Sequence, residues 1–367
     1  MSTSEQTVTS EQTVTSIDAL DPGWVTAALR TAGYPDARVT ELVAEPLSTG
    51  GAWCDIRRLV LHYEHPVDGA PASLIAKAPR NGPARPAGSA LGLFDRETRF
   101  YTELAGDVPL RIPRCFHPGD GDLGTEPILL EDLTAWSAGS QLDGLSLEQT
   151  HAVLEDLAGM HAKFWNSPRL AGADWLLRID SPVHIAVMEQ MAGAGIEPMR
   201  ARFEGTIEPD AMARGLEVCR RFGDVLRAVG ESEPKTLVHE DFRLDNFLFG
   251  PDGERLVLDW QVPSYARGVH DVAYLLTGSL QADLLSEHWE SLLRHYHDRL
   301  LAGGVTDYPW DELHTQYRQN VLYSFIFPLA LASALSIDSE QGAELGEVMV
   351  TRVFRHADEV DAYATFR

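Results

Sequence analysis

The chain has 367 residues, more than one hydrophobic core usually supports, so two lobes are expected. Hydrophobic residues make up 44% and charged residues 23% of it, the composition of an ordinary soluble globular protein. The formal net charge of −25 argues against a nucleic-acid or anionic-membrane partner, because such surfaces bind basic patches.

The cysteines and the N-terminus indicate a reducing compartment. Cys54, Cys115 and Cys219 are widely spaced and offer neither a disulfide framework nor a CxxC metal site. No signal-peptide pattern and no long uninterrupted apolar run is present in the sequence. We therefore expect a cytoplasmic protein, monomer or homodimer, with a small molecule as its partner and no nucleic acid or membrane.

The first residues form a perfect tandem repeat. Residues 3–8 and 9–14 both read Thr-Ser-Glu-Gln-Thr-Val. The repeat is polar, has no helical stripe and is too short to stack as a solenoid, so residues 1–16 are predicted to be a disordered tail.

The next segment predicts a small sheet. Apolar patterning indicates one helix and then three strands, at 17–33, 39–46, 55–63 and 72–78. The turn before the second strand contains Gly50 and Gly51, whose backbone N–H groups could approach phosphate oxygens. Two adjacent glycines are more often simply a hairpin turn, and the full G-x-G-x-x-G pattern is missing.

A lysine and a glutamate stand out beyond these strands. Lys77 closes the apolar run Leu74-Ile-Ala, where a solvated residue would be oddly placed. A helix is predicted over 94–104, and on it Glu97 shares a mostly apolar face; Asp95 and Glu103 are the competing carboxylates. Two more strand-like segments follow, at 112–117 and 126–133.

The remainder of the chain is mostly helical. Helices are predicted over 147–166, in an insert at about 167–233, and at 288–301, 308–334 and 342–366. Ser146 is the candidate N-cap of the first of these helices. Asp271 begins an apolar helix and is expected to cap it and to bond back to the loop described next.

The most informative stretch runs from Leu237 to Gln261. Two short apolar runs flank Gly250-Pro-Asp-Gly253, which is strong hairpin-turn chemistry. His239-x-Asp241-x-x-x-x-Asn246 precedes the hairpin, and Asp259 directly follows its second strand. The three polar side chains at the strand ends should therefore surround one small volume.

That grouping suits phosphoryl transfer. Asp241 could accept the proton of an acceptor hydroxyl, and Asn246 and Asp259 could hold Mg²⁺ through hard oxygen atoms. Arg243 could offset charge on the transferred phosphoryl group, and His239 is expected to orient the loop by hydrogen bonding.

These residues resemble the catalytic loop and metal-binding Asp of the protein-kinase-like fold, and more closely those of the aminoglycoside phosphotransferase and choline kinase superfamily. Trp260-Gln261 and the 292–308 segment look nearest to its ecdysteroid kinase-like subgroup. Arg243-Leu-Asp-Asn246 is also similar to kinase domains fused to acyl-CoA dehydrogenases. The resemblance covers nearly all of residues 40–330.

The resemblance implies an α+β, bilobal protein-kinase-like fold. A nucleotide-binding lobe (17–132) would hold a small antiparallel sheet with one main helix, and a large, mostly helical lobe (133–367) would hold the catalytic loop, the metal site and the acceptor-binding insert.

The resemblance also assigns nucleotide-binding residues. Lys77, paired with Glu97, would contact the phosphates of ATP or GTP. Gly50 and Gly51 would cover the phosphates, and Glu131 and Leu133 would belong to the hinge segment that holds the base. Mg²⁺ would be the second cofactor.

The implied function is transfer of the γ-phosphate of ATP to a hydroxyl of an antibiotic, a sugar or another natural product, in resistance, detoxification or biosynthesis. Many aminoglycoside kinases carry a second acid where this chain has Gln261, which argues against assuming an aminoglycoside acceptor. Two alternatives stay open. One is a nucleotide-binding regulatory module without turnover. The other is a metal-dependent hydrolase, built on His239, Asp241, Asp259, His270 and Asp271.

Overall fold

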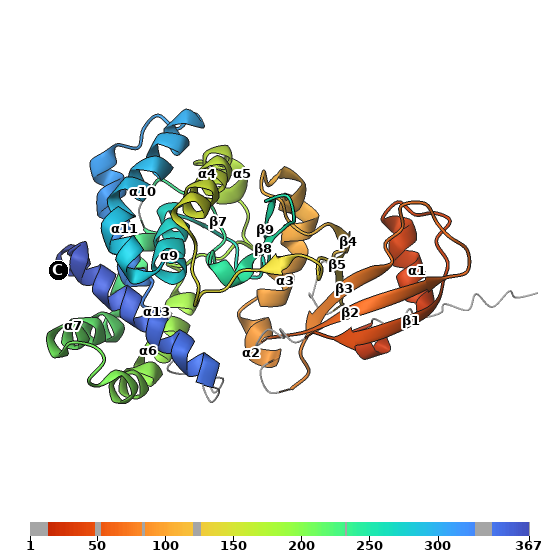
Figure 1. Ribbon diagram of the computed structural model, residues 1–367, viewed down its shortest axis with the longest axis horizontal. Helices are drawn as coiled ribbons and strands as arrows, with labels where there is room; N and C mark the ends of the chain where they lie inside the picture. Colours follow the sequence, from red (N-terminus) through yellow and green to blue (C-terminus); the bar gives the residue numbers. More distant parts are fainter. Residues whose placement is uncertain are drawn as a thin grey trace, which may run out of the picture. The chain divides into compact units, whose positions relative to one another are not determined.

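The computed structural model describes residues 14–47, 53–82, 85–119, 126–231, 233–326 and 340–366. The chain divides into two compact units (Figure 1). The first unit consists of Met1–Gly106 and Pro113–Leu133, and the second of Asp107–Ile112 and Thr134–Arg367. A small antiparallel sheet in the first unit and many helices in the second confirm the predicted α+β class.

The sheet of the first unit has five strands, all antiparallel to their neighbours. In spatial order they are β1 (Val39–Pro46), β2 (Cys54–Tyr63), β3 (Ser73–Pro79), β5 (Ile128–Glu131) and β4 (Cys115–His117). The first three match the predicted strands to within a residue. The last two are shorter than the predicted segments 112–117 and 126–133.

Helix α1 (Pro22–Thr31) contributes to the core of this unit. The Asp21 carboxylate accepts a hydrogen bond of 2.8 Å from the Trp24 amide, and Pro22 occupies the first helical position. Both features favour a helix start here, so the predicted helix at 17–33 instead begins at Pro22, after a short 3₁₀ turn at Ile17–Ala19. Val25 and Leu29 pack into a core cluster with strand residues such as Leu59 and Leu74.

The helix predicted over 94–104 is present in two parts. After α2 (Arg85–Ala90), α3 (Leu93–Arg99) continues directly into a π-helical segment, Phe100–Leu104, and a 3₁₀ turn, Ala105–Asp107. Glu97, on α3, is buried.

The second unit is built largely from helices (Figure 1). They are α4 (Leu147–Lys163), α5 (Pro168–Ala171), α6 (Pro182–Phe203), α7 (Pro209–Arg220), α8 (Phe222–Gly230), α9 (Val269–Ser279), α10 (Ala282–Ala302), α11 (Trp310–Tyr323) and α13 (Glu340–Glu359), followed by a 3₁₀ turn, Ala362–Thr365. Every residue of α9 is buried, and this helix packs against α10, α11 and α13. Part of the predicted helix at 308–334 lies outside the described residues.

Short strands frame the predicted catalytic loop. β7 (Thr236–Val238) pairs with β10 (Ser264–Ala266), while β8 (Phe247–Phe249) pairs with β9 (Arg255–Val257) and with β6 (Ser137–Ala138). The predicted hairpin is therefore present; Gly253, at φ 86°, takes the left-handed conformation that its turn requires. Residues 239–246 are held between β7 and β8, with a 3₁₀ turn at Leu244–Asn246.

Within the part of the chain that the structure describes, every helix is too short or too polar to cross a lipid bilayer.

Helix α4 begins with a reciprocal cap. Ser146 Oγ accepts from the Gln149 amide (3.1 Å), and the Gln149 side chain accepts from the Ser146 amide (2.9 Å). Because Ser146→Ala removes one of these acceptors, we expect it to lower the free energy of unfolding by about 1 kcal/mol. Urea unfolding of both proteins measures this. Ser291→Ala is the control: its hydroxyl lies inside α10 and bonds only to the His288 carbonyl, and an effect as large as that of Ser146→Ala would contradict the assignment.

Candidate functional site

His239 links the start of the loop to the end of the hairpin. Its Nε2 lies 2.8 Å from the Leu258 carbonyl, so it donates there, and its Nδ1 accepts from the Asp241 amide (3.3 Å). The ring is buried and meets the Trp260 ring edge-on, with centroids 4.6 Å apart. The hydrogen bonds by which His239 was predicted to orient the loop are present.

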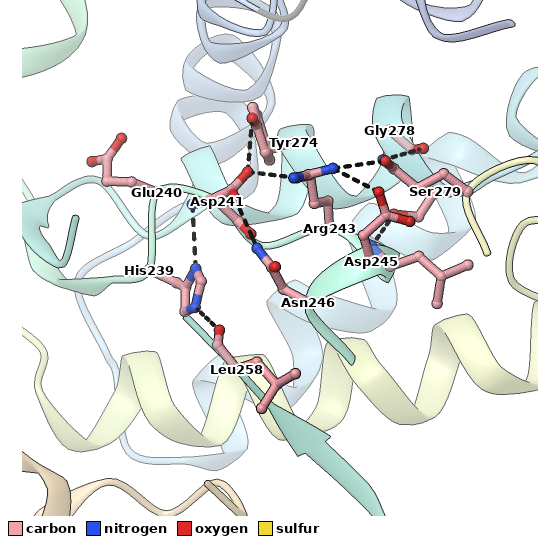
Figure 2. Close-up of polar contacts among 12 residues, drawn as sticks. His239, Glu240, Asp241, Arg243, Asp245, Asn246, Leu258, Tyr274, Gly278 and Ser279 are labelled. Carbon is pink, nitrogen blue, oxygen red and sulfur yellow. Dashed lines mark hydrogen bonds and ion pairs between the residues drawn. The ribbon is translucent and has the colours of Figure 1, made fainter. Parts of the chain in front are cut away.

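Asp241 is held through both carboxylate oxygens (Figure 2). Oδ1 accepts from Arg243 Nε (2.9 Å) and from the Tyr274 hydroxyl (3.0 Å), and Oδ2 accepts from Asn246 Nδ2 (2.8 Å). The side chain is still 27% exposed. Asp241 is therefore fixed in orientation while remaining within reach of a ligand.

Arg243 lies among acceptors. Besides Asp241, its guanidinium donates to Asp245 (2.8 Å) and to the Gln141 side chain (2.9 Å). Burial would lower the pKa of Arg243, but the charges of Asp241 and Asp245 outweigh it and raise that pKa. The same burial raises the pKa of Asp245, and Arg243 offsets this in part. The contact with Asp241 is observed; the role toward a phosphoryl group stays a prediction.

Asn246 and Asp259 present oxygen donors at the end of the hairpin. Asn246 Nδ2 donates to both the carboxylate and the carbonyl of Asp241, each at 2.8 Å. These bonds use the amide nitrogen, so the Asn246 Oδ1 atom can bind a cation. The Leu258 amide donates to the Asn246 carbonyl (2.8 Å), which brings the next residue, Asp259, beside it along the backbone. An amide and a carboxylate oxygen are hard donors that fit Mg²⁺.

Asp259 has φ 65° and Glu240 has φ 72°, left-handed conformations that cost a non-glycine residue about 1–2 kcal/mol each. Such strain persists only where surrounding bonds impose it. Here it occurs on both sides of the same loop and hairpin.

Asp271 supports the loop from α9. Its carboxylate accepts from the amides of His239 (2.8 Å) and Glu240 (3.0 Å), which confirms the predicted bond back to the loop. Its predicted role as N-cap is wrong, since Gly268 holds that position and Asp271 lies in the first turn. A side chain at Gly268 would meet the His161 ring, so a capping residue does not fit there.

The ionisation of Asp271 follows from its partners. Burial would raise the pKa of Asp271, but His161, whose Nε2 lies 3.5 Å away, together with His270 and His239, outweighs burial and lowers that pKa. Asp271 is thus a buried anion held by hydrogen bonds.

Glu240 is a buried site neighbour that the sequence analysis did not single out. Its carboxylate accepts from the hydroxyls of Ser264 and Tyr323 and lies 3.2 Å from His270 Nε2. Burial raises the pKa of Glu240. The sequence offered no signal for it beyond its place between His239 and Asp241.

Tyr274 and Gln141 were also missed. Tyr274 follows Asp271 by three residues on a predicted helix, so helical spacing could have pointed to it. Gln141, in the connection before α4, carried no signal, because its contact with Arg243 joins residues about a hundred positions apart.

The hydrolase alternative lacks a suitable ligand set. Both ring nitrogens of His239 are bonded, and His270 Nε2 faces Glu240. Among the described residues no group of three His, Cys, Asp or Glu side chains could hold a metal ion.

The nucleotide-binding predictions fall in the first unit. Lys77 Nζ on β3 lies 2.8 Å from Glu97 Oε1 on α3, and both side chains are buried, so the predicted pair is present. Glu131 ends β5 and accepts from the Arg114 amide (3.0 Å), and Leu133 is buried at the end of the unit. Gly50 and Gly51 lie outside the described residues.

The model of the ecdysteroid kinase-like family matches residues 178–303, about a third of the chain. The match spans the loop, the hairpin and α9. No curated protein is similar enough in sequence to count as a match.

Three solved structures are similar to this chain. The GDP complex of a variant aminoglycoside 2'-phosphotransferase-IIIa has a TM-score of 0.50 at 14% identity, covering 93% of this chain and 98% of that one. A macrolide 2'-phosphotransferase from Brachybacterium faecium has a TM-score of 0.48 at 16% identity, covering 89% and 98%. The choline kinase of Streptococcus pneumoniae has a TM-score of 0.48 at 13% identity, covering 92% and 97%.

The fold is therefore that of the protein-kinase-like phosphotransferases, as predicted. Within that class the loop-bearing segment carries the pattern of the ecdysteroid kinase-like family, which confirms the resemblance found in the sequence.

The lowered pKa of Asp271 predicts a pH-dependent stability. The charged carboxylate contributes stability that is complete above the unfolded-state pKa, about 3.9, and is lost as pH falls through the lower folded value. Asp271→Asn should therefore be less stable than the native protein at pH 7, and the difference should shrink at pH 3. Urea midpoints at both pH values test this. A difference that is equal at the two pH values would contradict it.

Proposed function

We propose that this protein is an ATP-dependent kinase that transfers the γ-phosphate to a hydroxyl group of a small molecule. The observation that carries the proposal is the arrangement around Asp241: a partly exposed carboxylate, fixed by Arg243, Tyr274 and Asn246. Phosphoryl transfer depends mainly on positioning and charge stabilisation, which is what such a rigid polar loop supplies.

In this proposal Asp241 accepts the proton of the acceptor hydroxyl as its oxygen attacks phosphorus. Asn246 Oδ1 and Asp259 would hold Mg²⁺, which when bound neutralises charge on the phosphate oxygens. His239 and Asp271 keep the loop in place, and Arg243 keeps Asp241 oriented.

The nucleotide is assigned by a second set of residues. In the first unit the Lys77 ammonium group is buried and held by the Glu97 carboxylate. The family resemblance implies that such a lysine contacts the phosphates of the nucleotide. The aminoglycoside phosphotransferase of similar fold was solved with GDP, so both ATP and GTP are to be tried as donors.

Turnover is tested by incubating the protein with ATP, Mg²⁺ and a panel of hydroxylated compounds: aminoglycosides, macrolides, sugars, choline and sterol-like alcohols. We expect one class of these compounds to raise the rate of ADP release above the rate measured without any acceptor. Asp241→Asn should lower it at least 100-fold, because the proton acceptor is gone. Asp252→Asn is the matched control, an exposed carboxylate in the hairpin turn. Equal loss in both variants would count against the assignment of Asp241.

Nucleotide binding tests the role of Lys77, and ADP release separates the kinase from a regulatory module. Lys77→Met should abolish the rise in melting temperature that ATP produces, whereas Lys163→Met, in the last turn of α4, should keep it. A module without turnover would show the same shift with no ADP release on any acceptor. A shift that survives in Lys77→Met would refute the phosphate-contacting role of Lys77.

A further inference from the structure

Helix α9 touches the catalytic loop at three successive points. Asp271 binds the amides of His239 and Glu240, the Tyr274 hydroxyl binds Asp241 Oδ1, and Ser279 Oγ accepts from the Leu244 amide (3.0 Å). Two of these contacts are to backbone and one is to the carboxylate itself. Figure 2 shows Tyr274 and Arg243 reaching the same oxygen of Asp241, and Asn246 reaching the other.

We propose that Tyr274 is a positioning residue which, with Arg243, occupies Oδ1 of Asp241 and so makes Oδ2 the oxygen that receives the proton of the acceptor hydroxyl. The inference rests on the proposed kinase function and deepens it by assigning the reacting atom.

The two oxygens of the Asp241 carboxylate differ in how many hydrogen bonds they accept. A carboxylate oxygen has two lone-pair sites. Those of Oδ1 are taken by Arg243 Nε and by the Tyr274 hydroxyl, at 2.9 and 3.0 Å. Oδ2 receives a hydrogen bond from Asn246 and, among the described residues, from no other group. One site on Oδ2 is therefore open, and it lies next to the residue expected to hold the metal.

The environment of Tyr274 keeps its hydroxyl a donor. The ring is buried in α9, packs with Met349 of α13 and lies 5.6 Å from the His270 ring. Burial raises the pKa of Tyr274 well above its usual value, and the neighbouring Asp241 charge raises it further. The phenol thus stays protonated and donates to the carboxylate, and it has little room to turn away.

Transfer of the phosphoryl group forms one bond to phosphorus and breaks another. The acceptor oxygen forms a bond to the γ-phosphorus, while the bond from that phosphorus to the bridging oxygen of ADP breaks and its electron pair leaves with ADP. The acceptor O–H bond breaks, and its proton moves to Asp241 Oδ2. The protonated carboxyl returns that proton to water after the products leave.

Tyr274→Phe removes only the hydroxyl. Without it the carboxylate can rotate about its bond and a site on Oδ1 opens, so the acceptor is no longer directed to one oxygen. We expect kcat to fall about 10- to 100-fold, the effect of losing one hydrogen bond to a charged group, with KM for ATP unchanged. Tyr317→Phe is the matched control: its hydroxyl is also buried and bonds to His356 (2.7 Å), away from the loop, so it should keep the native kcat.

A second measurement detects the contact without turnover. In protein labelled with ¹³C at the tyrosine Cζ, the Tyr274 resonance is the one missing from Tyr274→Phe. It should move in Asp241→Asn, where the charged acceptor is lost, and stay in place in Asp252→Asn. A purely structural tyrosine would not respond to the charge of Asp241.

The outcomes separate the two claims. If the native protein releases ADP no faster than Asp241→Asn, the kinase function and this inference both fail. If the native protein is active and Tyr274→Phe retains its kcat, the inference alone is overturned. The inference is also overturned if the chemical shift of Tyr274 is the same in Asp241→Asn as in the native protein. It is overturned likewise if kcat falls as much in Tyr317→Phe as in Tyr274→Phe.

Discussion

The two hydrogen bonds that the Asp271 carboxylate accepts from the amides of His239 and Glu240 determine where the loop lies. Asp271 can hold the loop because α9 is buried along its whole length and packs against three other helices. A buried anion is costly unless it is fully bonded, and here two amides and nearby His161 satisfy it. Since both amides belong to the start of the loop, any displacement of α9 also displaces Asp241.

Hydrogen bonds offset the backbone strain at Glu240 and Asp259. Glu240 and Asp259 take left-handed conformations, and bonds impose each of them: Asp271 holds the Glu240 amide, and the neighbouring Leu258 is bonded to both Asn246 and His239. Glu240 also turns its own carboxylate inward to Ser264 and Tyr323. The bend at Glu240 allows one residue to face the buried network while the next, Asp241, faces the partly open site.

Around Asp241, charged and neutral groups together fix the orientation of the carboxylate. Arg243 supplies the positive charge, and is itself shared with Asp245 and the Gln141 side chain. Tyr274 and Asn246 are neutral donors that fix the two oxygens without adding charge. A carboxylate held in this way loses little orientational freedom when a ligand binds. In the proposed kinase this positioning would be the main contribution of the loop, because phosphoryl transfer has a loose transition state.

The sequence by itself determined the strands β1 to β3, the hairpin at Gly250–Gly253 and the residues of the loop, because these depend on local apolar alternation and turn chemistry. The sequence also singled out Lys77 and Glu97, each a charged residue on an apolar face, and the family resemblance paired them. The sequence also indicated that His239 and Asp271 hold the loop, but only the tertiary structure showed three further contacts around it. Tyr274, Glu240 and Gln141 act across 24 to 102 positions of chain. Such contacts depend on which buried faces meet in the folded chain, and local patterning carries no record of that choice.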